Sequence, residues 1–249
     1  MLRSKKFISG LKSHNRNMML RVESINTFYG RAQILFDLTL AVKSGEVVAL
    51  LGRNGAGKTT TFKSIMGIVA LRRGTIYFKD QAIQSLAAFK ICALGLGYVP
   101  QDRRIFKRLT VIENLEVGRQ PSRKGFKPWT PERLFQLFPN LAERCHHTGG
   151  TLSGGEQQML SIARTLMGNP ELIILDEPSE GLAPVIVKQL AQTIRKIKSE
   201  GISVLMAEQN LNFARSVCDR ACIVYQGSIR YQSAIDDLPQ EVYEKYCAL

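Results

Sequence analysis

The sequence has no long apolar run. None of its uninterrupted apolar stretches reaches the roughly 18–20 residues that a helix needs to span a bilayer. The first residues, MLRSKKFISGLKSHNRNMM, also lack the apolar core and the small-residue cleavage site of a secretory signal. We therefore expect neither a channel nor a secretory leader.

Cysteine and histidine are both scarce. The chain has five cysteines, an odd number without the paired spacing of metal ligands: Cys92, Cys145, Cys218, Cys222 and Cys247. Without a leader, this pattern indicates free thiols in a reducing compartment. The three histidines (His14, His146 and His147) all precede residue 150. The later part of the chain therefore has no imidazole to offer to a ligand.

Acidic residues are outnumbered by basic ones, which gives a formal net charge of +13. Residues 1–17 hold five basic side chains and no acid. We expect residues 1–18 to be a basic, disordered extension, or alternatively a tail attracted to an anionic membrane surface. The basic run RRIFKR at 103–108 could suggest nucleic acid, but no RNA-reading motif, zinc finger or basic zipper accompanies it. Nucleic acid is therefore not an expected partner.

Apolar strands alternate with helical patterns over much of the chain. Residues 46–52, 171–177 and 202–208 are continuous apolar strands, and 156–168 and 184–201 have helical spacing. Such alternation favours a mainly parallel sheet with helices on both faces. Residues 20–42 instead form two β-rich segments, 102–155 form a mostly helical insert, and 220–232 form a hairpin that turns at Gln226-Gly227.

A glycine-rich loop joins the strand at 46–52 to a helix. GRNGAGKTT fits G-x-x-x-x-G-K-[ST], the P-loop, in the strand–loop–helix context that the motif requires. Its backbone N–H groups are expected to bind phosphate oxygens. Lys58 would reach the β- and γ-phosphates and Thr59 would hold Mg²⁺. The predicted loop residues are Gly52, Arg53, Asn54, Gly55, Ala56, Gly57, Lys58, Thr59 and Thr60.

Two adjacent acids end the strand LIILDE. Buried carboxylates at this end of an inner strand are costly unless a cation lies nearby. Beside a P-loop, Asp176 is placed to anchor Mg²⁺ and Glu177 to act as general base on the attacking water.

The stretch TLSGGEQQ precedes a strongly periodic helix. Ser153, Gly154 and Gly155 provide a second helix start that could bind an anion. Taken alone, the same residues are more often an N-cap followed by a glycine turn.

In this order, the P-loop, LSGGEQQ and LIILDEP resemble the nucleotide-binding domain of ATP-binding cassette (ABC) proteins. The resemblance implies an α/β P-loop NTPase core with an N-terminal antiparallel β portion and an α-helical subdomain inserted at about 102–155, all within one domain at 19–249. It also implies a head-to-tail dimer, in which Ser153, Gly154 and Gly155 face the γ-phosphate bound by the partner's P-loop.

The same resemblance implies roles for further residues. Tyr29 matches the aromatic residue that stacks on adenine, and Gln101 matches the glutamine that touches Mg²⁺ and links the core to the insert. Gln209 takes the place of the usual histidine at the γ-phosphate, and Ala183 stands where most relatives have aspartate. Glu208, just before Gln209, could simply cap its strand.

Several of these motifs together look like one of the two ATPase subunits of branched-chain amino acid importers, the second type: YVPQDRRIF, LSGGEQQML, DEPSEGLAP and EQN. Glutamine at 209 and alanine at 183 are usual there. This resemblance implies a peripheral subunit at the cytoplasmic face of the inner membrane. Its partners would be a sister or identical ATPase, two permease subunits and, indirectly, a periplasmic or extracellular binding protein.

Other members of the family leave alternatives open. Urea and short-chain amide importers share much of the pattern, whereas a lipopolysaccharide-export ATPase shares GAGKTTTF but would keep the histidine. A soluble ABC ATPase without a transport role has only the basic charge in its favour.

Overall fold

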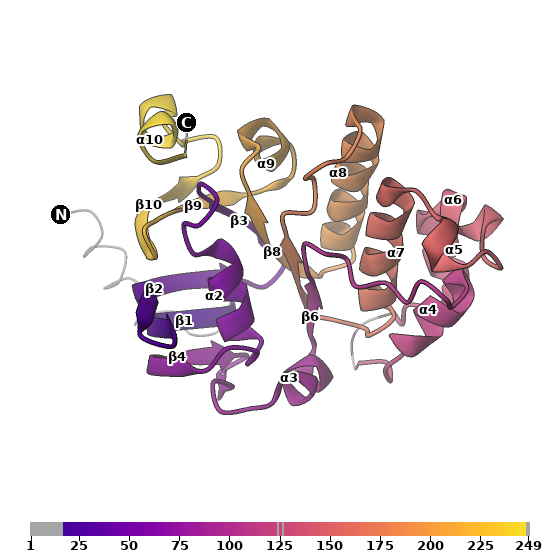
Figure 1. Ribbon diagram of the computed structural model, residues 1–249, viewed down its shortest axis with the longest axis horizontal. Coiled ribbons are helices and arrows are strands. Elements are labelled where there is room, and N and C mark those ends of the chain that lie inside the picture. Colours follow the sequence, from indigo (N-terminus) through magenta and orange to yellow (C-terminus); the bar gives the residue numbers. More distant parts are fainter. Residues whose placement is uncertain (1–16, 124, 126, 248–249) are drawn as a thin grey trace.

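The computed structural model describes residues 17–247 except 124 and 126. The expected extension at 1–18 lies almost wholly outside these residues, and Met18 already belongs to the first strand. The described residues form a four-stranded sheet and a six-stranded sheet with helices packed around them (Figure 1). None of the described helices is long and apolar enough to cross a membrane.

The six-stranded sheet forms the centre of the molecule. Its strand order is β10-β9-β3-β8-β7-β6, and every neighbouring pair is parallel except β9 with β10. The strands span β3 (Val47–Leu51), β6 (Leu96–Val99), β7 (Leu172–Asp176), β8 (Ser203–Glu208), β9 (Arg220–Tyr225) and β10 (Ser228–Ala234). This confirms the expected α/β class with a mainly parallel sheet.

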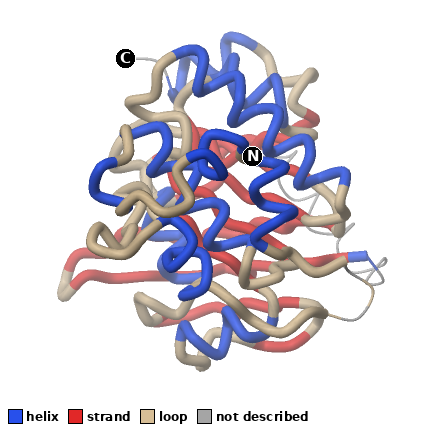
Figure 2. The backbone as a smooth tube through the Cα atoms, turned by 90° about the vertical axis from the view of Figure 1, so that its right-hand side faces the viewer, coloured by secondary structure: helices blue, strands red, loops and turns tan. Residues whose placement is uncertain are grey.

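Both faces of this sheet are covered, which explains why its central strands are apolar throughout. Along β3, Val48 and Leu50 pack toward the four-stranded sheet, while Val47, Ala49 and Leu51 pack toward the opposite helices. Those helices are α7 (Gly154–Leu166), α8 (Pro184–Ser199) and α9 (Leu211–Val217). Seen from their side, helices lie in front of the strands (Figure 2).

The antiparallel sheet has the order β2-β1-β4-β5. Its strands are β1 (Met18–Tyr29), β2 (Ala32–Lys43), β4 (Leu71–Phe78) and the two-residue β5 (Gln81–Ala82). Together with α2 (Lys58–Ile65) it covers one face of the central sheet, with Phe62 and Ile65 buried between them. The antiparallel portion expected at the N-terminus is thus present.

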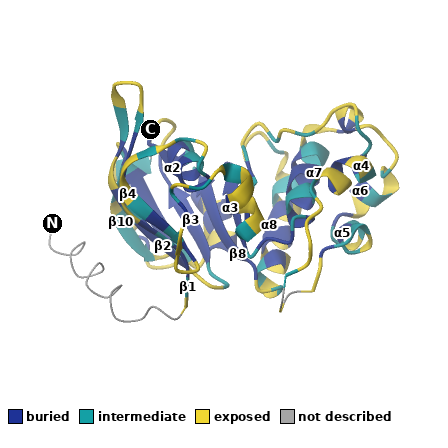
Figure 3. Ribbon diagram, turned by 90° about the horizontal axis from the view of Figure 1, so that it is seen from below, coloured by how far each residue is buried: buried dark blue, intermediate teal, exposed yellow. Residues whose placement is uncertain are grey.

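The stretch between β6 and β7 is helical, as the insert at about 102–155 predicts. It holds α4 (Val111–Val117), α5 (Pro131–Leu137), α6 (Pro139–Glu143) and the short 3₁₀ helix η2 (Gly149–Thr151) before α7 begins. Thr110 and Thr130 cap α4 and α5 through their side-chain oxygens. Figure 3 shows these helices at the end of the molecule opposite the antiparallel sheet.

Two helices have weak sequence signals and were not expected. The first is α3 (Ala88–Leu94), which buries only Ile91, and the second is α10 (Gln240–Cys247), which buries no residue fully. In α3 only Ile91 is buried, so there is little periodic signal to detect. In α10, Val242, Tyr243, Tyr246 and Cys247 do form a partly buried face against the core, and this face was not predicted from the sequence.

The predicted hairpin turn connects three parts of the molecule. Gln226 and Gly227 both have positive φ (47° and 74°), as a two-residue β9–β10 turn requires. The Gly227 N–H donates to the Ala56 carbonyl in the P-loop, and the Gly227 carbonyl accepts the Phe36 N–H from β2. The turn therefore holds the phosphate loop against the antiparallel sheet.

We expect Gly227→Ala to lower the free energy of unfolding by about 2–4 kcal/mol, because a Cβ would overlap the Ile34 carbonyl oxygen and φ is positive. Gly30→Ala is the matched control: its φ is also positive (58°), but no atom lies within 4 Å of the added Cβ. Urea titrations of both variants measure the difference. Equal losses would mean that the close approach at Gly227 is unimportant.

Candidate functional site

The carboxyl ends of three parallel strands meet beside the P-loop. In the register of the sheet, Leu51 of β3 lies opposite Glu208 of β8, and Asp176 of β7 lies opposite Ala207. The loop that follows β3 and the acids that end β7 and β8 therefore share one edge of the sheet. Open parallel sheets bind their ligands at this edge.

The P-loop curls back over the start of α2. Gly55 and Gly57 adopt left-handed φ values of 78° and 109°, which glycine tolerates without strain. Lys58, at the first position of α2, is only 3% exposed, and its Nζ donates to the carbonyl oxygens of Gly52 (2.7 Å) and Arg53 (3.1 Å). The ammonium group is thereby held inside the loop.

Lys58 also forms a buried ion pair. Its Nζ lies 2.9 Å from Oε1 of Glu177, whose side chain is 6% exposed. Glu177 has a positive φ of 49°, an uncommon conformation for a side chain of this size. This backbone twist directs the carboxylate from the end of β7 toward the lysine.

Gln209 approaches the same carboxylate from the other side. Its side-chain Nε2 donates to Oε2 of Glu177 (3.1 Å) and to Oδ1 of Asn54 (2.8 Å). Glu177 thus lies between Lys58 and Gln209. Lys58 begins α2 and the other two residues follow β7 and β8, and the structure brings all three together.

Asp176 faces Thr59. The Thr59 hydroxyl donates to Oδ1 of Asp176 (3.0 Å), and the Tyr98 hydroxyl donates to Oδ2 (3.1 Å). Burial raises the pKa of Asp176, and these two hydrogen bonds only partly oppose it. Burial and the neighbouring carboxylate likewise raise the pKa of Tyr98, so the phenol stays protonated and remains a donor.

The oxygen donors at Thr59 and Asp176 suit a hard cation such as Mg²⁺. Among the described residues, no cluster of three or more His, Cys, Asp or Glu side chains could hold a metal. Mg²⁺ is often held by one or two carboxylates together with the phosphates of a nucleotide. The residues present therefore fit an ion that binds along with ATP.

Two predicted residues lie away from this cluster. Tyr29 ends β1 and is 46% exposed. Gln101 follows β6, and its Nε2 donates to Oε2 of Glu180 (2.6 Å). Among the described residues, Gln101 has no hydrogen bond to Thr59 or Asp176. Its side chain instead bonds the loop after β7.

Ser153, Gly154 and Gly155 lie at the start of α7, on the opposite side of β6 from α2 (Figure 1). The Ser153 Oγ accepts the Glu156 N–H, and the Glu156 carboxylate accepts the Ser153 N–H at 2.8 Å. The N-cap that the sequence allowed is present, as part of a capping box. One chain thus keeps its P-loop and its LSGGEQQ loop apart.

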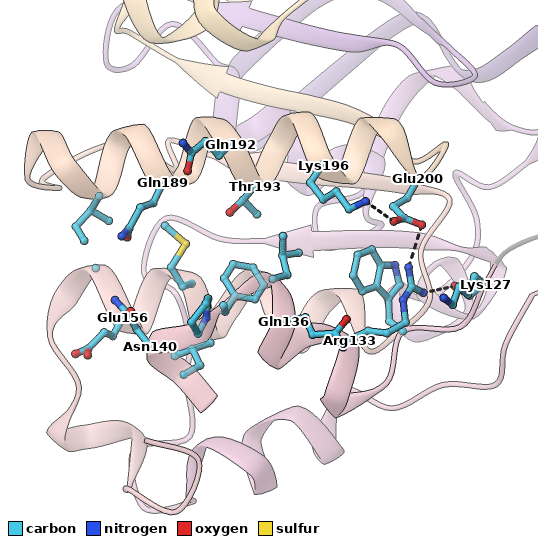
Figure 4. A pocket seen from close by; sticks show the side chains of 18 residues that line it. Lys127, Arg133, Gln136, Asn140, Glu156, Gln189, Gln192, Thr193, Lys196 and Glu200 are labelled. Carbon is cyan, nitrogen blue, oxygen red and sulfur yellow. Dashed lines mark hydrogen bonds and ion pairs between the residues drawn. The ribbon is translucent and has the colours of Figure 1, made fainter. Parts of the chain in front are cut away.

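A cavity of about 690 Å³ separates α5 and α6 from α8 (Figure 4). Its floor is apolar, with Phe138, Met159 and Ile186, and Gly155 lies in its wall. At one end Arg133 pairs with Glu200 (2.9 Å). This cavity contains none of the P-loop residues, so it is separate from the site at the sheet edge.

The sequence did not single out three residues that contact the predicted site residues. They are Tyr98, which donates to Asp176; Glu180, which accepts from Gln101; and Tyr243, whose hydroxyl donates to the Gln209 carbonyl (2.6 Å). Tyr98 had a weak signal, as a polar-tipped residue near the end of β6, the edge strand of the described six-stranded sheet. Glu180 and Tyr243 had none, since their contacts depend on loops and on α10.

Curated proteins with similar sequences are transport ATPases. The high-affinity branched-chain amino acid transport ATP-binding protein BraG of Pseudomonas aeruginosa is 41% identical over 211 residues, which cover 85% of this chain and 91% of BraG. The lipopolysaccharide export system ATP-binding protein LptB of Haemophilus influenzae is 37% identical, covering 85% and 88%. A probable branched-chain amino acid transport ATP-binding protein LivF of Archaeoglobus fulgidus is 32% identical, covering 92% and 98%.

Solved structures agree with these sequence relatives. The ADP conformation of MJ1267, an ATP-binding cassette of an ABC transporter, superposes with a TM-score of 0.77 at 27% identity, covering 91% of this chain and 97% of that one. The family model described as ABC transporter matches residues 35–180. This stretch contains the P-loop, the LSGGEQQ loop and the acids that end β7. The chain therefore belongs to the ABC transporter family, as an ATP-binding subunit that hydrolyses ATP.

Proposed function

We propose that this chain powers an importer of branched-chain amino acids from the cytoplasmic face of the membrane. The observation that carries this proposal is Gln209, which hydrogen-bonds Glu177 at the sheet edge where other family members use histidine. The alanine at 183 and the 41% identity with BraG support the same assignment.

ATP binding begins with the P-loop. Backbone N–H groups around Gly55 and Gly57 would bind the phosphates, and the buried ammonium of Lys58 would pair with the β- and γ-phosphates. The exposed ring of Tyr29 is available to stack on adenine. Because Lys58 already pairs with Glu177, an arriving γ-phosphate competes with that carboxylate for the lysine.

Hydrolysis requires a general base and a group that hydrogen-bonds the γ-phosphate or the attacking water. Once Lys58 turns to the phosphate, the Glu177 carboxylate is free to take a proton from the attacking water. Gln209 would hydrogen-bond the γ-phosphate or that water through its amide, which does not ionise near neutral pH. Both side chains therefore act on the same end of ATP.

Magnesium would be held by Thr59 and Asp176, with Gln101 joining from the loop after β6. When bound, the ion supplies positive charge that offsets the charge developing on the phosphate oxygens. In this arrangement the Tyr98 hydroxyl fixes the orientation of the Asp176 carboxylate.

A second ATPase chain would complete the site. Ser153, Gly154 and Gly155 begin α7, whereas the P-loop leads into α2, and this separation supports a head-to-tail pair in which each LSGGEQQ loop faces the partner's ATP. The helical segment at 102–155 would pass closure of this pair to two permease subunits. A binding protein outside the membrane would deliver the amino acid.

Lipopolysaccharide export is a second candidate because LptB is 37% identical over most of both chains. The glutamine at 209 counts against it, since the export ATPase would keep the histidine. Import of urea or short-chain amides shares the sequence pattern and differs only in substrate, which this subunit does not contact.

Glu177→Gln should reduce ATP turnover about 100-fold or more, because the amide cannot accept the proton from water. ATP binding should be kept or tightened, since Lys58 loses only the carboxylate that competes with phosphate. Steady-state hydrolysis and nucleotide titration measure the two effects. Glu171→Gln, which changes the residue just before the other end of β7, should leave turnover unchanged. Near-normal hydrolysis by Glu177→Gln would remove the general-base assignment.

Gln209→Ala should lower kcat about 10-fold with little change in KM, since one hydrogen bond to a charged group is lost. Gln209→His should introduce a pH dependence with an apparent pKa of about 6.5, absent from the natural chain. Turnover measured between pH 5.5 and 8.5, a range of about three units around that value, checks both. Unchanged kcat in Gln209→Ala would leave Gln209 without a role in hydrolysis.

Deletion of the gene should abolish uptake of labelled leucine, isoleucine and valine. The natural gene should restore uptake, whereas a gene carrying Lys58→Ala should not, because the P-loop then lacks its cation. Urea uptake is measured in parallel in the same strains. Loss of urea uptake alone would assign the subunit to an amide importer instead.

A further inference from the structure

Glu208 is a buried carboxylate at the end of β8. It is 3% exposed and has no salt-bridge partner among the residues described. Burial raises the pKa of Glu208, which shows that this environment disfavours its charge. A buried carboxylate without a cation is costly unless several donors satisfy it, and here the donors are backbone N–H groups together with the Ser179 side chain.

These donors come from two different loops. Oε1 accepts the N–H of Ser179 (3.1 Å), in the loop after β7. Oε2 accepts the N–H groups of Gln209 (3.2 Å) and Asn210 (3.4 Å), in the loop after β8. A side chain that only capped the end of β8 would need Oε2 alone, because Oε2 accepts from the residues directly after the strand. Glu208 therefore joins the two loops through one side chain.

Each loop carries a residue of the proposed reaction. Glu177 lies two residues before Ser179, and its own N–H donates to the Ala207 carbonyl (3.1 Å). Gln209 is held at its N–H by Glu208 and at its carbonyl by the Tyr243 hydroxyl. The relative position of the two side chains, which lie 3.1 Å apart, thus depends on Glu208.

The loop after β7 is also bonded on its opposite side. The Glu180 carboxylate accepts from the Gln101 side chain (2.6 Å), which lies at the start of the helical segment. Hydrogen bonds at the adjacent residues Ser179 and Glu180 therefore connect the loop after β7 to Glu208 on one side and to Gln101 on the other.

We infer that Glu208 is a positioning residue that makes the loops of Glu177 and Gln209 move as one unit. The inference rests on the proposed roles of those two residues in hydrolysis. It does not depend on which substrate the transporter carries.

Glu208→Gln tests this inference with little change in shape. The new NH₂ group must face either Ser179 N–H or the two N–H groups of the other loop, so one side of the bridge is lost. We expect kcat to fall about 10-fold, the size of effect that a hydrogen bond to a charged group supports. KM and the midpoint of thermal unfolding should change little.

A double-mutant cycle separates positioning from general damage. If Glu208 acts through Gln209, Glu208→Gln combined with Gln209→Ala should be no slower than Gln209→Ala alone. If the double variant instead shows the product of the two single-variant losses in kcat, the inference is overturned. An unchanged kcat in Glu208→Gln alone would also overturn it.

Asp219→Asn is the matched control. The Asp219 carboxylate also accepts a backbone N–H, from Val47 at the opposite end of β3 (2.9 Å). Loss of this hydrogen bond in Asp219→Asn should lower the stability of the full chain but leave its kcat unchanged. Glu177→Gln, measured alongside, shows separately whether the proposed hydrolysis fails: if that variant hydrolyses ATP normally, the roles themselves are wrong, whatever Glu208 does.

Discussion

Parallel pairing of β3, β8 and β7 is the constraint on which the rest of the structure depends. The backbone register places the ends of these strands side by side, with Leu51 opposite Glu208 and Asp176 opposite Ala207. The hydrogen bonds between neighbouring strands fix that register. The loops that follow these strands therefore begin next to one another. Residues more than a hundred positions apart, such as Lys58 and Glu177, therefore meet within hydrogen-bond distance.

Charge burial at this edge would be unfavourable without compensation. Lys58, Asp176, Glu177 and Glu208 are all less than a tenth exposed, and each is satisfied differently. Lys58 and Glu177 neutralise one another, Asp176 accepts two hydroxyl groups, and Glu208 accepts backbone N–H groups. Such satisfied networks hold their members in one geometry. The arriving phosphate then meets groups that are already oriented.

In the proposed head-to-tail pair, one ATP site has two halves, which lie apart within a single chain. The P-loop and the acids that end β7 lie at the edge of the central sheet, while the LSGGEQQ loop begins α7 in the helical part (Figure 3). The cavity between α5, α6 and α8 separates part of that helical segment from the core (Figure 4). A second copy or sister chain is the simplest way to bring such halves together, and it makes hydrolysis depend on how two chains approach.

The sequence by itself determined the family, the fold class and the residues at the sheet edge. Apolar strands that end in GRNGAGKTT and in Asp176-Glu177 are local signals, because strand, loop and charge are neighbours in the chain. The helix α3 was not predicted because it buries only Ile91 and so leaves little periodic pattern. The helix α10 was also missed, although its partly buried face follows helical spacing. Only the tertiary structure decided that Glu208 bridges two loops, that Tyr98 and Tyr243 hold Asp176 and Gln209, and that Gln101 binds Glu180. Those contacts join segments distant in sequence, and the register of the parallel sheet, which no local pattern encodes, brings them within reach.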